Sequence, residues 1–152
     1  MYIDNVGVIG EDGTVVADTL DAVIETLESK GLATHERVVS CGELDVLGVV
    51  LDSGRQHTRI SRKRVWRTRG ALLYLASRPR ASGQMVEITV GRATFAGLLR
   101  REVLSVFHTV YAFMTTHYHE QAPLWESCRA ELRAFAGLLV MLVADWGPLG
   151  TR

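Results

Sequence analysis

Apolar residues recur at steps of three and four through the last third of the chain, and this spacing predicts two long amphipathic helices. The first stripe consists of Phe95, Leu98, Leu99, Val103, Val106, Phe107, Val110, Tyr111 and Met114. The second helix is predicted to begin near Pro123, and its stripe consists of Trp125, Cys128, Leu132, Phe135, Leu139, Leu142 and Trp146. Two such helices in succession are expected to form a hairpin that buries both stripes.

Shorter apolar runs and turn signals alternate through residues 1–60. Residues 2–10, YIDNVGVIG, have the composition of a strand, and the EDG that follows predicts a turn. Residues 18–31 predict a helix that is capped by Asp18 or Thr19 and stopped by Gly31. Its apolar face consists of Leu20, Val23, Ile24 and Leu27. Residues 37–61 predict one or two short strands and a hairpin.

The middle of the chain, SRKRVWRTRGALLYLAS at residues 61–77, has a helical pattern with a cationic first half and an apolar second half. Basic residues near a helix N-terminus oppose the helix dipole, and an anionic partner would explain them. Trp66 is interpreted as a core residue in preference to a stacking platform. Residues 79–84 predict a linker, and residues 85–90, MVEITV, fit a strand or a helix.

These elements together predict an α+β fold, with a small antiparallel sheet in the N-terminal third followed by a mainly helical bundle. The chain has 152 residues, of which 47% are hydrophobic, which suits one globular domain with a core. No apolar stretch has the length of a membrane span, and no secretion signal is recognisable, so a cytoplasmic or nuclear protein is expected. Cys41 and Cys128 are predicted to be buried thiols.

The formal net charge of zero hides a division of the chain. Residues 1–52 contain eleven acidic and two basic residues, whereas residues 53–86 contain nine basic residues and no acid. This asymmetry suggests contact with a polyanion. The alternative is a solvated basic face that the acidic third balances in space.

The stretch YIDN at residues 2–5 places Asp4 in an apolar run, where a carboxylate needs a partner. It resembles the tyrosine, any residue and two aspartates of the catalytic hairpin of reverse transcriptases, the RNA-directed DNA polymerases of retroelements. The resemblance implies that Asp4 and Asn5 occupy the catalytic positions and that Asp4 is a ligand of Mg²⁺. Asn5 replaces the second aspartate, which weakens such a metal site.

Five later segments follow in the order of the same family, and they extend the resemblance over nearly the whole chain: AVIETLESKGLATH, LDVLGVVLD, TRISRKRVWRTRGALLYLAS, VGRATFAGLLRREVLSVFHTVYAF and PLWESCRAELRAF. They resemble the helix after the catalytic hairpin, the approach to the primer grip, the first thumb helix, the helices after it, and the stretch before the ribonuclease H region. The resemblance implies a palm-like region at residues 1–58 and a helical thumb and connection-like region at residues 59–152.

The implied partner is an RNA or DNA primer–template, with dNTP as a ligand of the full-length enzyme alone. The residues expected to contact phosphates are Arg59, Arg62, Lys63, Arg67 and Arg69. At helical spacing Arg59, Arg62 or Lys63, and Arg67 would share one face. The family's other metal-binding aspartate precedes these segments. The chain is therefore interpreted as part of a retrotransposon polymerase that is inactive alone.

A non-enzymatic α+β module is the alternative, in which residues 92–147 form a helical pair for oligomerisation and the basic segment binds nucleic acid or nothing. If residues 6–9 form a palm strand without its partners, that sheet edge is expected to favour self-association. His117 and His119 form an H-x-H pair beside Glu120. An exposed loop is the default interpretation of this pair, and metal binding is the alternative.

Overall fold

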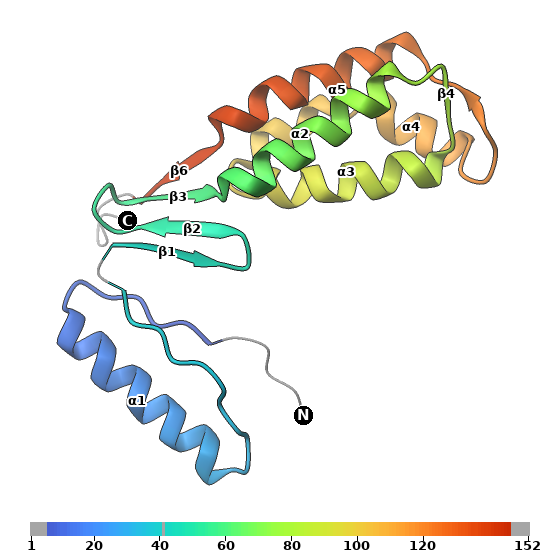
Figure 1. The fold of residues 1–152 in the computed structure, drawn as a ribbon. Helices are drawn as coiled ribbons and strands as arrows, with labels where there is room; N and C mark the ends of the chain where they lie inside the picture. Colours follow the sequence, from blue (N-terminus) through green and yellow to red (C-terminus); the bar gives the residue numbers. More distant parts are fainter. Residues whose placement is uncertain (1–5, 41, 147–152) are drawn as a thin grey trace. The chain divides into compact units, whose positions relative to one another are not determined.

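The protein has an α+β fold, and the computed structural model describes residues 6–40 and 42–146 (Figure 1). Contacts within the chain separate two compact units, residues 1–42 and residues 43–152. Residues 43–58 therefore share a unit with the helices that follow them. The functional division into palm-like and thumb-like regions at residue 58 stays a prediction.

The first unit contains one helix, α1 (Gly13–Ser29). Asp12 caps it, since its Oδ1 accepts hydrogen bonds from the backbone N–H groups of Thr14 at 2.8 Å and Val15 at 3.3 Å. The helix therefore begins earlier than the predicted cap at Asp18 or Thr19. Gly31 follows its end with a φ of +76°, as the predicted stop requires.

Polar contacts fasten the segment after α1 back onto the helix. Thr34 Oγ1 donates to Glu28 Oε1 at 2.7 Å, and Arg37 Nη2 donates to Asp21 Oδ2 at 2.9 Å. The predicted apolar face of α1 is half-buried, and none of residues 6–40 and 42 is fully buried. Surface polar contacts and one half-covered stripe thus hold this unit.

The strand predicted at residues 2–10 is wrong for the part that the structure describes. Residues 6–10 form no strand, and Val6 and Ile9 are 47% and 70% exposed. A single extended segment needs a neighbouring strand for its backbone hydrogen bonds, and in the described chain no strand pairs with this one. The sheet edge expected to cause self-association is accordingly not formed by residues 6–9.

The second unit begins with an antiparallel meander of β1 (Glu43–Val46), β2 (Val49–Asp52) and β3 (His57–Ile60). A fourth strand, β6 (Val143–Asp145), pairs with β3, which gives the order β1-β2-β3-β6. The predicted hairpin is confirmed, and β6 extends the small antiparallel sheet with a strand from the C-terminal part of the chain. The Trp146 indole N–H donates to Thr58 Oγ1 at 2.6 Å and secures the last strand.

A helical bundle completes the unit (Figure 1), with α2 (Arg62–Ser77), α3 (Gly83–Gly97), α4 (Thr109–Thr116) and α5 (Glu126–Leu138). Two 3₁₀ helices, η1 (Arg101–Val106) and η2 (Leu139–Met141), and the paired strands β4 (Arg80–Ala81) and β5 (Ala122–Pro123) connect them. Helix α2 packs against both α3 and α5. The fully buried centre includes Leu72, Leu75, Val86, Val90, Val110, Phe113, Cys128, Leu132, Phe135 and Leu139.

The continuous helix predicted across residues 95–114 is broken into α3, η1 and α4. Gly97 lies so close to the Leu104 side chain that a Cβ at residue 97 would require Leu104 to shift, because η1 folds back onto the end of α3. Phe107 then stacks on Phe135 with 4.5 Å between ring centroids.

The start of the last helix also differs from expectation, since Pro123 lies in β5 and α5 begins at Glu126. Within the described residues no helix is long and apolar enough to cross a bilayer.

Cys128 is fully buried in α5, as predicted, and Cys41 lies outside the described residues. Burial raises the pKa of the Cys128 thiol, which points toward the Thr109 carbonyl oxygen at 3.4 Å. A buried thiol with a raised pKa is protonated at neutral pH and serves as a small packing group.

Glu131 on α5 caps the N-terminus of α4. Its carboxylate oxygens accept hydrogen bonds from the backbone N–H groups of Thr109 at 2.8 Å and Val110 at 2.9 Å. Burial raises the pKa of Glu131, but these hydrogen bonds and the nearby His108 outweigh burial, so that its pKa lies below the usual 4.5. The ionised Glu131 carboxylate therefore stabilises the fold above about pH 4.5. This stabilisation is lost as the pH falls through the lowered pKa of the folded state.

We expect Glu131→Gln to lower the free energy of unfolding at pH 7 by about 1–2 kcal/mol, because an amide cannot accept both hydrogen bonds. Below the folded pKa of Glu131 the wild type loses this advantage, and the two proteins should converge. Urea unfolding at neutral and acidic pH measures the difference. Equal stability of the two proteins at pH 7 would contradict the capping role.

Candidate nucleic-acid interface

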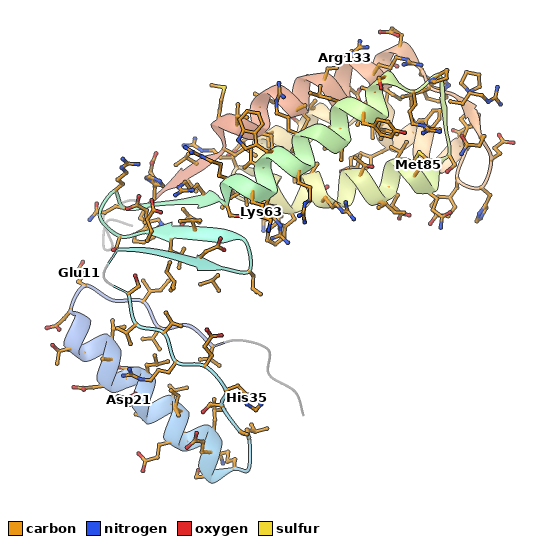
Figure 2. All side chains as sticks on the ribbon, in the orientation of Figure 1. Glu11, Asp21, His35, Lys63, Met85 and Arg133 are labelled. Atoms are coloured by element: carbon orange, nitrogen blue, oxygen red, sulfur yellow. The ribbon has the colours of Figure 1, made fainter. Side chains whose placement is uncertain are left out.

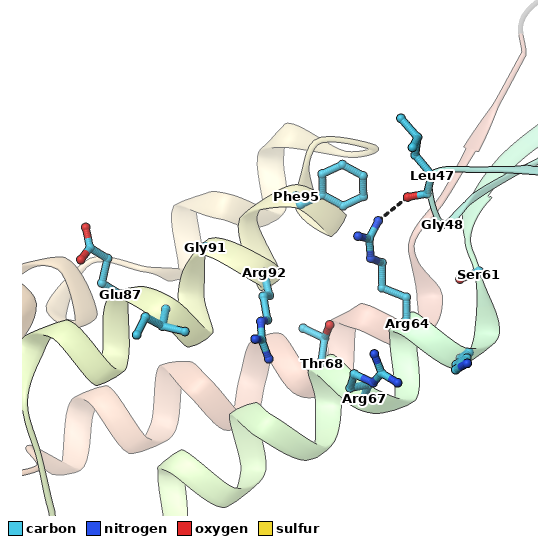
Figure 3. A pocket seen from close by; sticks show the side chains of 12 residues that line it. Leu47, Gly48, Ser61, Arg64, Arg67, Thr68, Glu87, Gly91, Arg92 and Phe95 are labelled. Atoms are coloured by element: carbon cyan, nitrogen blue, oxygen red, sulfur yellow. Dashed lines mark hydrogen bonds between the residues drawn. The ribbon is translucent and has the colours of Figure 1, made fainter. Parts of the chain in front are cut away.

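A groove of about 740 Å³ opens within the second unit between the β1–β2 turn, the first half of α2 and the middle of α3 (Figure 3). We call it the basic groove. Its lining consists of Leu47, Gly48, Ser61, Lys63, Arg64, Arg67, Thr68, Glu87, Ile88, Gly91, Arg92 and Phe95.

Positive charge dominates the basic groove. Lys63, Arg64 and Arg67 come from α2, and Arg92 faces them from α3, whereas Glu87 is the one carboxylate in the lining. Figure 2 shows Lys63 at the start of α2, and Figure 3 shows Arg67 and Arg92 on opposite walls. Such an excess of positive charge in a concave surface attracts anionic ligands.

Glu87 is already engaged at the far end of the groove. Its Oε2 accepts a hydrogen bond from the Tyr118 hydroxyl at 2.8 Å. This hydrogen bond, followed by the charge of Glu87, raises the pKa of Tyr118, so that the phenol remains a donor at neutral pH. The carboxylate is thereby directed toward Tyr118.

Arg64 connects the sheet to the helical walls of the groove. Its Nη1 donates to the Leu47 carbonyl oxygen, and its Cζ lies 4.4 Å from the centroid of the Phe95 ring. Gly48 makes room for this guanidinium, because a Cβ at residue 48 would lie 2.7 Å from Arg64 Nη1. Arg64 is thus a structural cation, while Lys63, Arg67 and Arg92 are the side chains offered to a ligand.

The first turn of α2 begins unfavourably for an isolated helix. Ser61 occupies the N-cap without a side-chain hydrogen bond, and Arg62, Lys63 and Arg64 follow it directly. Cations in this position oppose the helix dipole at a cost of several tenths of a kcal/mol each. A bound anion would reverse this penalty, since it would meet both the cations and the unpaired N–H groups of the helix end.

The predicted phosphate-contacting residues occupy four different places. Lys63 and Arg67 line the basic groove, and Arg62 is exposed on α2 outside the lining. Arg69 is half-buried, with its Cζ 5.4 Å from the Trp66 ring centroid. Arg59 lies in β3 and pairs with Glu43 at 2.9 Å, so the expectation that it shares a helical face is wrong. The helix starts at Arg62 because β3 is needed in the sheet through Ile60.

Sequence reasoning missed Arg64, Arg92 and Phe95 as parts of this site. Arg64 stands inside the basic run, but its inward direction depends on the Leu47 turn. Arg92 and Phe95 follow residues 85–90, whose sequence fits a strand or a helix equally. Their approach to α2 depends on how α3 packs. The basic run alone gave no signal for Arg92 and Phe95.

Asp4 and Asn5, the predicted catalytic and metal-binding residues, lie outside the described residues. Within residues 6–40 and 42–146, no three His, Cys, Asp or Glu side chains gather in a group suited to a metal ion. His117 Nδ1 lies 2.8 Å from Glu120 Oε1, in an ion-pairing arrangement. His119 is exposed and lies beside Tyr118. Both histidines follow α4, as the default interpretation expects, but His117 is half-buried beside Phe113 and Trp125.

Trp66 is not a core residue, contrary to the prediction. It is 56% exposed, because α2 directs Thr68, Leu72, Leu75 and Ala76 into the bundle and turns Trp66 outward.

No protein-family model, curated protein or solved structure matches this chain.

Leu47 adopts a φ of +57° beside Gly48 at +83°, in the two-residue turn between β1 and β2. Both central residues of this turn type need positive φ, which favours Asn-Gly. Leu47 is 68% exposed and loses little packing when it is replaced. We expect Leu47→Asn to raise the free energy of unfolding by about 1 kcal/mol relative to Leu47→Ala, because asparagine tolerates this conformation. Urea unfolding tests this, and a less stable Leu47→Asn protein would contradict the strained turn.

Proposed function

We propose that residues 43–152 bind the sugar–phosphate backbone of nucleic acid in the basic groove. The observation that carries this proposal is the convergence of Lys63, Arg67 and Arg92 from two helices on one concave surface. Phosphates follow one another along a strand, so a ligand with repeated negative charge suits cations that are spread along a groove better than a single small anion does. Contacts of this kind hold a nucleic acid without reading its sequence.

The resemblance to reverse transcriptases supports an RNA or DNA primer–template as the ligand. The basic helix, the turn before it and the helix opposite it come from the segments that resemble the thumb and the approach to the primer grip. In a complete retroelement polymerase, Asp4 would hold Mg²⁺ with Asn5 beside it, and dNTP would bind there. Because the described residues contain no such metal group, no step of this proposal depends on Mg²⁺.

The non-enzymatic alternative divides into nucleic-acid binding and oligomerisation. The apolar stripe of α5 is already buried inside the second unit, since Cys128, Leu132 and Phe135 are fully buried there. That stripe is not free to bind a second copy. The observation favours a nucleic-acid-binding module over an oligomerisation module that would use this face.

We expect Lys63→Ala, Arg67→Ala and Arg92→Ala each to weaken binding of a labelled RNA–DNA hybrid about fivefold at low salt, on the order of 1 kcal/mol for each lost charged contact. Fluorescence anisotropy titration of the full chain measures this. Arg101→Ala is the matched control, because Arg101 is an exposed arginine on η1 outside the groove. Wild-type affinity in all three groove variants, or an equal loss in Arg101→Ala, would overturn the proposal.

A further inference from the structure

Two aromatic residues stand exposed on α2 outside the lining of the basic groove. Trp66 is 56% exposed and Tyr74 is 64% exposed, and neither lines the groove. Gly70 lies between them at four-residue steps, so the three positions follow one ridge of the helix. A Cβ at Gly70 would meet nothing within 4 Å, and the helix surface between the rings is therefore open. The Cα atoms of Trp66 and Tyr74 are separated by about 12 Å along the helix axis.

Each ring has an arginine beside it. Arg69 Cζ lies 5.4 Å from the Trp66 ring centroid, and Arg78 Cζ lies 5.6 Å from the Tyr74 ring centroid. Arg78 Nη1 also donates to the Tyr74 hydroxyl at 2.9 Å. These contacts restrain the rings without covering them, which lowers the entropy that a ligand must remove when it stacks.

The charge of α2 and the exposed rings of this ridge indicate which kind of ligand it binds. Residues 53–86, which include all of α2, contain no acidic residue, so a negatively charged ligand is favoured. Exposed aromatic rings favour a ligand that also offers flat, unpaired ring faces. A single-stranded nucleic acid combines both properties, whereas a duplex already stacks its bases on one another.

We propose that Trp66 and Tyr74 form a stacking track for the unpaired bases of a single-stranded nucleic acid, with phosphates held by the flanking arginines. A base rise of about 3.4 Å in a stacked strand is much shorter than the separation of the two residues along the helix. The rings therefore bind different bases of one strand, with other nucleotides spanning the open surface at Gly70. This function is additional to duplex binding in the basic groove and uses different side chains.

The test is a pair of anisotropy titrations of the full chain, with a labelled oligothymidylate as the single strand and a labelled RNA–DNA hybrid as the duplex. Trp66→Ala, Trp66→Leu and Tyr74→Ala remove an aromatic face, whereas Trp66→Phe keeps one. Tyr111→Ala is the control, because Tyr111 is a similarly exposed aromatic on α4. All of these residues are at least partly exposed, so the fold should tolerate the changes.

We expect Trp66→Ala, Trp66→Leu and Tyr74→Ala to bind the oligothymidylate about tenfold more weakly, in line with the loss of one stacked base. Trp66→Phe and Tyr111→Ala should stay within about twofold of the wild type, and duplex affinity should be unchanged in all of them. Unchanged single-strand affinity in Trp66→Ala, or equal affinity in Trp66→Leu and Trp66→Phe, would overturn the stacking track. The groove proposal would survive that result if its own variants still weaken duplex binding. If the wild type binds neither probe, both proposals fail.

Discussion

The packing of α2 between α3 and α5 is the constraint on which the second unit depends. Leu72 of α2 and Leu132 of α5 are both fully buried, and α2 makes its most extensive contacts with α5. Because β3 continues into α2 through Ser61 alone, this burial also fixes the sheet against the end of the bundle. After α5 the chain continues through η2 into β6, and β6 pairs with β3. The end of the bundle is thereby connected to the sheet a second time. The core thus determines which side of α2 faces α3 and which faces outward.

The two proposed binding surfaces follow from that orientation. With its apolar face buried, α2 presents Lys63 and Arg67 to the groove beside α3 and turns Trp66 outward. Arg64 is the side chain that links both layers, through the Leu47 carbonyl and the Phe95 ring. The cations of the groove repel one another when no ligand is bound, and a bound anion would reduce this repulsion. The same feature that weakens α2 as an isolated helix therefore supports its proposed function.

Local patterns in the sequence predict some elements, such as α2, and miss others, such as the break of the helix expected across residues 95–114. The helical pattern of residues 61–77 predicts α2 to within one residue. The predicted apolar stripe identifies the buried face of α5, but Leu142 and Trp146 of that stripe lie beyond the end of the helix. The pairing of β6 with β3 joins segments more than eighty residues apart in sequence, and no local signal specifies it. The break after α3 depends on contact between Gly97 and Leu104, and the groove depends on the approach of Arg92 to α2. These features belong to tertiary packing, whereas the basic run that suggested a polyanion is visible in the sequence itself.

The most direct test of the groove as a phosphate-binding surface is the salt dependence of its affinity for an RNA–DNA hybrid. Each phosphate contact releases about one counterion, so the logarithm of the affinity falls linearly with the logarithm of salt concentration. If Lys63, Arg67 and Arg92 each contact a phosphate, the combined alanine variant should have a slope shallower by about 2–3 than the wild type. A wild-type slope near zero, or the same slope in both proteins, would contradict the account.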